Sequence, residues 1–206
     1  MADTKRKIGI MGGTFDPIHT GHLVIAEAVR VEYDLERVLF IPAANPPHKQ
    51  HFQVETALHR YMMAVMATYS NPHFFVSPIE LERPGLSYTI DTVLELIEQY
   101  GNNTEFYFIT GSDAVQELST WKDVDRLLEV CHFIAATRPG CSYTLEDIIK
   151  HFGVKGCQRI HSLETPELEI SSTDIRERVR QGRSIKYIVP ESVENYIIKE
   201  NLYKRL

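Results

Sequence analysis

The sequence predicts an α/β protein built on a doubly wound, mostly parallel sheet with helices on both faces and a small C-terminal helical part. Short apolar runs alternate with helix-like segments, which is typical of parallel strands joined by right-handed crossovers. A glycine-rich turn separates the first such run from the first helix-like segment. No internal repeat, low-complexity tract or linker divides the chain. We therefore expect one domain over residues 1–206, with residues 171–206 forming helices packed on it.

Six short apolar runs are predicted as strands because Gly, Pro or polar residues bound them. In chain order they cover residues 7–11, 37–42, 74–76, 105–110, 132–136 and 158–163. Pro42 ends the second run and Gly111 follows the fourth. Ligands of such sheets bind beyond the carboxyl ends of the strands. The candidate functional loops are therefore residues 12–22, 43–52, 85–89, 111–121 and 138–140.

Helices are predicted between these strands and near the C-terminus, which makes the fold Rossmann-like. They cover residues 23–33, 55–69, 88–100, 114–118, 123–130, 145–152, 172–181 and 190–201. Segment 88–100 has the clearest amphipathic spacing, and segment 55–69 is rich in helix formers without Gly or Pro. Ser171 lies three residues before Asp174 in a capping pattern, and Pro190 suits a first helical position.

Composition excludes several classes of protein. With 206 residues, 43% hydrophobic and 24% charged, the chain is expected to be globular. A net charge of −6 argues against a nucleic-acid surface and favours a small anionic partner. No apolar run suits a membrane span or a signal peptide, so we expect a cytoplasmic protein without membrane contact. Three cysteines without C-x-x-C spacing indicate reduced thiols rather than disulfides or a zinc site.

The loop over residues 12–22 is the strongest functional signal in the chain. It places two glycines and two histidines between the first strand and the first helix. Bare backbone N–H groups and the positive end of a helix together favour an anion. Gly12 and Gly13 lack a Cβ and allow a phosphate to approach the backbone. His19 and His22 lie three residues apart, so both can face the same ligand.

Two common nucleotide motifs are absent from this loop. Its glycines do not follow the G-x-G-x-x-G spacing of dehydrogenases, and the chain contains no Walker A sequence. His19-Thr20-Gly21-His22 instead resembles the H-x-G-H signature of the nucleotidylyltransferase superfamily. Further motifs, in the same order, resemble the bacterial nicotinate-nucleotide adenylyltransferases: Gly12 to His22, Asn45-Pro46-Pro47-His48-Lys49, Ser87 to Thr92, Gly111-Ser112-Asp113 with Trp121, Arg138-Pro139-Gly140 and Ile170 to Arg176.

This resemblance implies an enzyme that transfers the adenylyl group of ATP to nicotinate mononucleotide, giving nicotinate adenine dinucleotide and pyrophosphate. The transfer is direct and in line, without a covalent enzyme intermediate. It implies three catalytic residues that act as hydrogen-bond donors and charge stabilisers: His19, His22 and Arg176. Mg²⁺ is expected to be carried mainly by the ATP phosphates, with no dedicated metal site in the protein.

The resemblance also divides the binding residues between the two substrates. ATP is expected to contact Gly12, Gly13, Thr14, Phe15, His19, His22, Gly111, Asp113, Ile170, Ser171, Ser172 and Arg176. The mononucleotide is expected to contact Asn45, His48, Lys49, Thr89, Trp121 and Arg138. Trp121 is the residue expected to stack on the pyridine ring.

Other interpretations of the same residues stay open at this point. The acceptor could be nicotinamide mononucleotide or the substrate of another H-x-G-H adenylyltransferase, or the chain could be a non-catalytic nucleotide sensor. His19 and His22 could be a metal pair, although no third ligand is apparent. Asp16-Pro17 is interpreted as a turn device, and Trp121 alone would suit a hydrophobic core. Closed symmetric dimers are the commonest oligomers, so a homodimer is expected.

Overall fold

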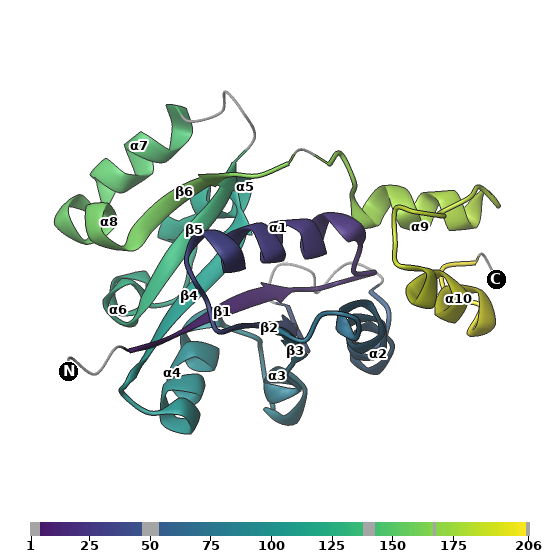
Figure 1. Cartoon of the computed structure of the whole chain (residues 1–206), viewed down its shortest axis with the longest axis horizontal. Helices are drawn as coiled ribbons and strands as arrows, with labels where there is room; N and C mark the ends of the chain where they lie inside the picture. The colour runs from purple at the N-terminus through teal and green to yellow at the C-terminus, as the bar shows by residue number, and fades with distance from the viewer. Residues whose placement is uncertain (1–4, 47–53, 138–142, 167, 205–206) are drawn as a thin grey trace.

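A single parallel sheet organises the molecule (Figure 1). The computed structural model describes residues 5–46, 54–137, 143–166 and 168–204. Six strands pair in the order β3-β2-β1-β4-β5-β6, and all pairs are parallel. Their bounds are β1 (Arg6–Gly13), β2 (Arg37–Pro42), β3 (Phe74–Val76), β4 (Thr104–Gly111), β5 (Cys131–Thr137) and β6 (Ile160–Glu164). This order confirms the predicted Rossmann-like sheet.

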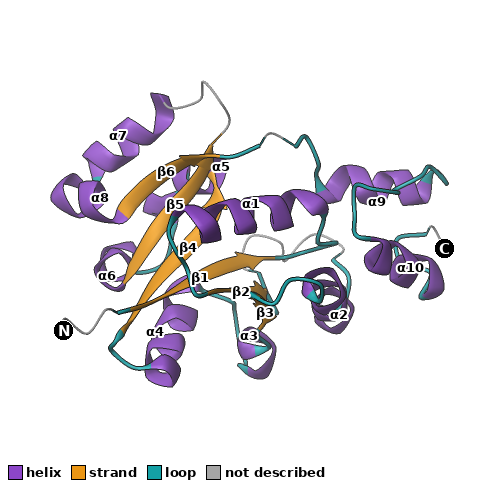
Figure 2. Cartoon of the chain, in the orientation of Figure 1, coloured by secondary structure: helices purple, strands orange, loops and turns teal. Residues whose placement is uncertain are grey.

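Helices cover both faces of this sheet (Figure 2). They are α1 (Thr20–Glu32), α2 (Ala57–Thr68), α3 (Ile79–Glu82), α4 (Thr89–Tyr100), α5 (Ser112–Gln116), the 3₁₀ helix η2 (Leu118–Thr120), α6 (Val124–Val130), α7 (Tyr143–His151), α8 (Gly153–Arg159), α9 (Ser172–Arg180) and α10 (Glu191–Lys199). Two hydrophobic clusters result. One contains residues of α1, α2, α9 and α10, and the other contains residues of α3, α4, α5, α6 and α7.

The strands divide between these clusters because successive side chains point to opposite faces. In β2, Val38 and Phe40 belong to the cluster under α1, whereas Leu39 and Ile41 belong to the cluster under α4. Burial on both faces explains why the strands read as continuous apolar runs rather than as alternating patterns.

The order of the sheet fixes the position of a crevice. Strand β1 pairs with β2 on one side and with β4 on the other. The chain therefore builds the sheet outward from β1 in one direction through β2 and β3, and then in the other direction from β4. In open α/β sheets ligands bind at such a switch point, beyond the carboxyl ends of the strands. The glycine–histidine loop follows β1 directly, and α5 follows β4.

The structure contains all six predicted strands and differs from the sequence prediction mainly at helices. Helix α1 begins at Thr20, earlier than predicted, and places His19 at its N-cap. Helices α3 and α8 were not predicted. Helix α3 has only four residues, and α8 contains two glycines, which normally disfavour helix. A Cβ at Gly156 would collide with the carbonyl of Ile149, so packing against α7 requires glycine there.

No helix in the described ranges is long and apolar enough to cross a membrane. Among those residues Cys131 is buried, Cys157 is exposed, and both are free thiols.

Candidate active site

The end of β1, which contains Gly12 and Gly13, is closely packed and leaves little room for side chains at these glycines. A Cβ at Gly12 would lie 3.0 Å from Phe108 Cζ, and one at Gly13 would lie 3.0 Å from Phe15 Cε1. Phe15 has a φ of 50° and is 2% exposed, and its ring makes a T-shaped contact with His22 at 5.1 Å. The buried Phe15 ring therefore helps to fix the orientation of the His22 ring.

His19 and His22 are joined across the first turn of α1. The backbone N–H of His19 donates to Nδ1 of His22 at 3.2 Å, and the N–H of His22 donates to the carbonyl of His19 at 3.0 Å. Because Nδ1 of His22 accepts, the ring proton lies on Nε2. The two ring centroids are 3.8 Å apart. A Cβ at Gly21 would lie 3.1 Å from the His19 ring, which explains the glycine between the two histidines.

Both histidines are neutral at neutral pH. Burial lowers the pKa of His19 to about 4. Burial, with a smaller contribution from His19, lowers the pKa of His22 to about 3. Nδ1 of His19 is buried and has no hydrogen-bond partner within the described ranges. This atom faces the first turn of α1, because a Cβ at Gly21 would lie 3.1 Å from it. The N-terminus of α1 itself favours an anion through the helix dipole.

The N-terminus of α9 lies against the same loop, although it is about 160 residues away in the chain. Arg176 donates from Nη1 to the carbonyl of Asp16 at 2.6 Å and from Nη2 to Thr173 Oγ1 at 3.2 Å. Ser172 donates to the carbonyl of Pro17 at 2.9 Å. Ser171 caps α9 by accepting the N–H of Asp174 at 3.1 Å. The structure thus brings a guanidinium and two histidines to one loop.

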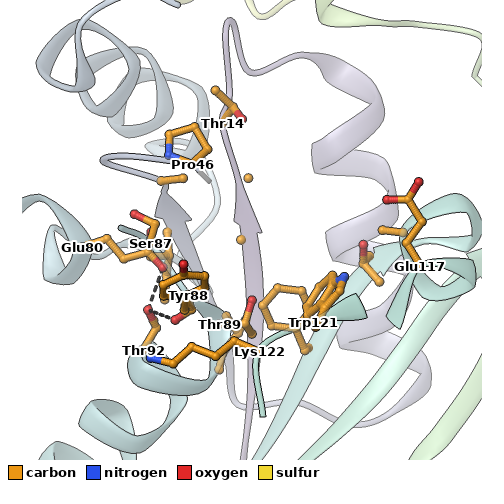
Figure 3. Close-up of a pocket in the computed structure, with 18 of the residues that line it drawn as sticks. Thr14, Pro46, Glu80, Ser87, Tyr88, Thr89, Thr92, Glu117, Trp121 and Lys122 are labelled. Carbon is orange, nitrogen blue, oxygen red and sulfur yellow. Dashed lines mark hydrogen bonds between the residues drawn. The ribbon is translucent and has the colours of Figure 1, made fainter. Parts of the chain in front are cut away.

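A cavity of about 510 Å³ opens beside Thr14 (Figure 3). Residues at and beyond the ends of β1, β2 and β4 and from the start of α4 line it, including Gly12, Gly13, Thr14, Thr89 and Trp121. Trp121 makes T-shaped contacts with Phe108 at 5.6 Å and with Phe133 at 5.8 Å. It therefore contacts the core and also lines the cavity, and its stacking on a pyridine ring stays a prediction.

Polar side chains form part of the cavity wall near Thr89. Thr92 donates to Glu80, which is 8% exposed, at 2.7 Å, as the dashed lines of Figure 3 show. Lys122 pairs with Asp91 at 2.9 Å and lies 4.6 Å from the ring centre of Tyr88. The sequence prediction did not include Glu80 and Lys122 among the site residues. Neither belongs to the motifs that contain Thr89 and Trp121.

The sequence comparisons assign the chain to a family. A model of the cytidylyltransferase-like family matches residues 10–178. The probable nicotinate-nucleotide adenylyltransferase of Moorella thermoacetica is 55% identical over 199 residues, covering 96% of this chain and 92% of that protein. The protein of the same name from Thermoanaerobacter sp. is also 55% identical, covering 97% and 95%. The chain belongs to the nicotinate-nucleotide adenylyltransferase family.

A solved structure supports the fold of this family member. Nicotinic acid mononucleotide adenylyltransferase from Plasmodium falciparum, complexed with NaAD, superposes with a TM-score of 0.78 at 24% sequence identity. The match covers 96% of this chain and 97% of that one. At this identity the comparison confirms the Rossmann-like arrangement and nothing finer.

The predicted residues of this nicotinate-nucleotide adenylyltransferase family member lie in several parts of the structure. His19 and His22 lie at the start of α1, and Ile170 directly precedes the Ser171 cap of α9. Thr89 and Trp121 line the cavity, whereas Asn45 is exposed and donates to the carbonyl of Gly85 at 2.9 Å. The exposed Gly111 and Asp113 lie where β4 meets α5. Outside the described residues lie His48, Lys49 and Arg138.

Two residues near the loop have contacts that the sequence did not predict. Arg60, on α2, is 1% exposed and donates to the carbonyls of Thr14 at 2.6 Å, Glu55 at 2.9 Å and Ala44 at 3.3 Å. Asp16, interpreted from sequence as a turn device, is 3% exposed and accepts the hydroxyl of Tyr203 at 2.8 Å. For Arg60, the one feature of the sequence that could have indicated a buried position is that an arginine stands among the apolar residues of segment 55–69.

Replacing Trp121 with alanine tests its contact with the acceptor. We expect the KM for the mononucleotide to rise about tenfold, since stacking on an aromatic side chain contributes roughly 1–3 kcal/mol. The KM for ATP should stay unchanged. Steady-state kinetics with each substrate varied in turn measures both, and Trp121→Phe, which keeps a ring, is the control. Equal changes in both KM values would contradict a specific role at the acceptor side.

Proposed function

We propose that this chain transfers the adenylyl group of ATP to nicotinate mononucleotide, releasing nicotinate adenine dinucleotide and pyrophosphate. One observation carries the proposal. One segment carries the two neutral histidines at the start of α1, binds Arg176 through the Asp16 carbonyl, and contributes Gly12, Gly13 and Thr14 to a cavity that Trp121 also lines. Two anionic substrates bound along this segment would meet at the switch point of the sheet.

The reaction needs no nucleophile from the protein. A phosphate oxygen of the mononucleotide attacks the α-phosphorus of ATP, and the bond from that phosphorus to the bridging oxygen breaks as pyrophosphate leaves. Both reactants are anions, so the site has to orient them in line and to stabilise the charge that develops. Backbone N–H groups and neutral or cationic donors are sufficient for both tasks.

The residues of the loop take the donor roles. His22 donates from Nε2, because its Nδ1 already accepts the N–H of His19. Burial keeps both imidazoles neutral, so they act as hydrogen-bond donors and add no charge of their own. Thr14 contributes a hydroxyl, and Arg176 contributes a planar guanidinium that suits phosphate oxygens. Gly12 and Gly13 let the phosphates approach the backbone.

Mg²⁺ enters this proposal as an ion bound to the ATP phosphates. The donor set around the loop consists of imidazoles, a guanidinium and hydroxyls, which fit phosphate oxygens rather than a hard cation. Within the described ranges, no group of three or more His, Cys, Asp or Glu side chains could hold a metal. When bound, the ion neutralises part of the triphosphate charge.

The cavity supports an acid rather than an amide as acceptor. The N-terminus of α4 begins at Thr89, which lines the cavity, and the free N–H groups and dipole of a helix N-terminus favour a carboxylate. An uncharged amide would leave this positive potential unmatched. Nicotinamide mononucleotide is therefore the weaker acceptor in this proposal.

Pyrophosphate release tests the proposal directly. The chain is incubated with ATP, Mg²⁺ and either nicotinate or nicotinamide mononucleotide. We expect release with both, and a kcat/KM at least about tenfold higher for the nicotinate form, the size of one hydrogen bond to a charged group. Absence of pyrophosphate with both acceptors would refute the enzyme proposal and support the nucleotide-sensor interpretation. Preference for the amide would refute the assignment of nicotinate.

A further inference from the structure

The C-terminal turn of the chain contacts the loop after β1 through a buried tyrosine. Tyr203 follows α10, has a φ of 62° and is 8% exposed. Its hydroxyl donates to Oδ1 of Asp16 at 2.8 Å, across 187 residues of sequence. Burial and the neighbouring Asp16 carboxylate both raise the pKa of Tyr203, so the phenol keeps its proton and acts as a donor.

Asp16 connects this tyrosine to Arg176. Its main-chain carbonyl accepts from Arg176 Nη1 at 2.6 Å, and its carboxylate oxygen Oδ2 lies 3.7 Å from the same nitrogen. Asp16 is 3% exposed, while the Arg176 side chain is 19% exposed. One buried carboxylate thus lies between a buried hydroxyl and a guanidinium that can reach solvent.

We propose that Tyr203 and Asp16 are positioning residues that hold the guanidinium of Arg176 toward the triphosphate of the nucleotide. The inference rests on the proposed function, in which Arg176 contacts ATP. Asp16 and Thr173 engage one N–H on each of its two terminal nitrogens, so further N–H groups of the five are left for an anion. The C-terminal turn then belongs to the ATP side of the site.

Loss of the Tyr203 hydroxyl has a defined consequence in this arrangement. Oδ1 of Asp16 would lose its donor while remaining buried, which is unfavourable for a carboxylate. Two cations, Arg176 and Arg60, lie near enough to Asp16 to feel its charge. Arg60 is already held by three carbonyls, so Arg176 is the freer of the two. Its guanidinium would turn toward Asp16 and away from the nucleotide.

Tyr203→Phe removes this hydroxyl and keeps the ring. We expect the KM for ATP to rise about tenfold, as for one hydrogen bond to a charged group, and the KM for the mononucleotide to stay within about twofold, less than half a kcal/mol. Tyr107→Phe is the matched control, because that tyrosine is 6% exposed and donates to Glu105 at 3.2 Å on β4, outside the site. The control should leave both KM values unchanged.

A double-mutant cycle separates positioning from a general loss of structure. In an Arg176→Ala background, Tyr203→Phe should change the KM for ATP by less than about twofold, because residues that act through one another are not additive. An equal effect in both backgrounds, or no effect on ATP in the unmodified chain, would overturn the proposal. If Tyr203→Phe does not fold, Asp16→Asn enters the same cycle, with the same expectation.

Titration calorimetry with ATP alone compares ATP binding by the native chain and by the same variants in the absence of turnover. Weaker ATP binding by Tyr203→Phe, abolished in the Arg176→Ala background, supports the positioning role. Unchanged ATP binding refutes it. A chain that binds ATP but releases no pyrophosphate would refute the proposed function while still testing Tyr203.

Discussion

Replacing His22 with alanine is expected to lower kcat by at least about a hundredfold, the usual loss for one donor to a transition state. The side chain is fixed by two contacts: its Nδ1 accepts the N–H of His19, and its ring meets the edge of Phe15. Nε2–H is therefore the part of the ring left for the phosphates. Pyrophosphate release at saturating substrates measures kcat, and His151→Ala, at an exposed position on α7, is the control.

Two further variants test which nitrogen of His22 matters. Asparagine places its amide near the position of Nδ1, where it can still accept the His19 N–H, but it offers no donor at Nε2. Glutamine places its amide nearer to Nε2. We expect His22→Asn to be as inactive as His22→Ala and His22→Gln to retain more activity. The reverse order would show that the tautomer is wrongly assigned, and a near-normal kcat for His22→Ala would contradict its role altogether.

The sheet could be predicted because its signal is local. Each strand is a short apolar run closed by Gly, Pro or polar residues, and burial on both faces makes the run continuous. Helix ends were less predictable. Helix α1 starts at Thr20, where the N3 residue His22 accepts the N–H of the N-cap His19, a capping-box contact that sequence patterns assign to Glu or Gln. Helix α8 contradicts propensity, since Gly156 is required by packing.

The candidate site also has a part that local sequence predicts and a part that depends on long-range contacts. His19, His22 and the glycines stand in one local motif, and their proximity follows from the helix repeat. The buried contacts around them are long-range. Asp16 meets Tyr203 across nearly the whole chain, and the three carbonyls bound by Arg60 belong to separate segments. No periodicity reports such contacts, because a buried arginine and an exposed one look the same in a helical sequence.

The contacts of Arg60 lead to the largest expected effect on stability. Arg60→Met keeps much of the apolar stem but leaves the carbonyls of Thr14, Ala44 and Glu55 without their donor. A fully buried carbonyl left unpaired costs roughly 1–3 kcal/mol, and these three are partly buried, so each lies toward the lower end. Against this, burial lowers the pKa of Arg60, which shows that the buried charge itself is unfavourable and that its removal offsets part of the loss. We expect the free energy of unfolding to fall by about 3 kcal/mol.

Urea denaturation of the Arg60 variants measures this change. Arg60→Lys keeps the charge but cannot span three carbonyls, so it should lie between the native chain and Arg60→Met. Arg180→Met, which removes an exposed pair with Glu177 at 3.4 Å, should change stability by less than about 1 kcal/mol. Because Arg60 bonds both the histidine loop at Thr14 and the segment after β2 at Ala44, Arg60→Met should also raise the KM for both substrates. A stable variant with normal KM values would mean that neither loop depends on this arginine.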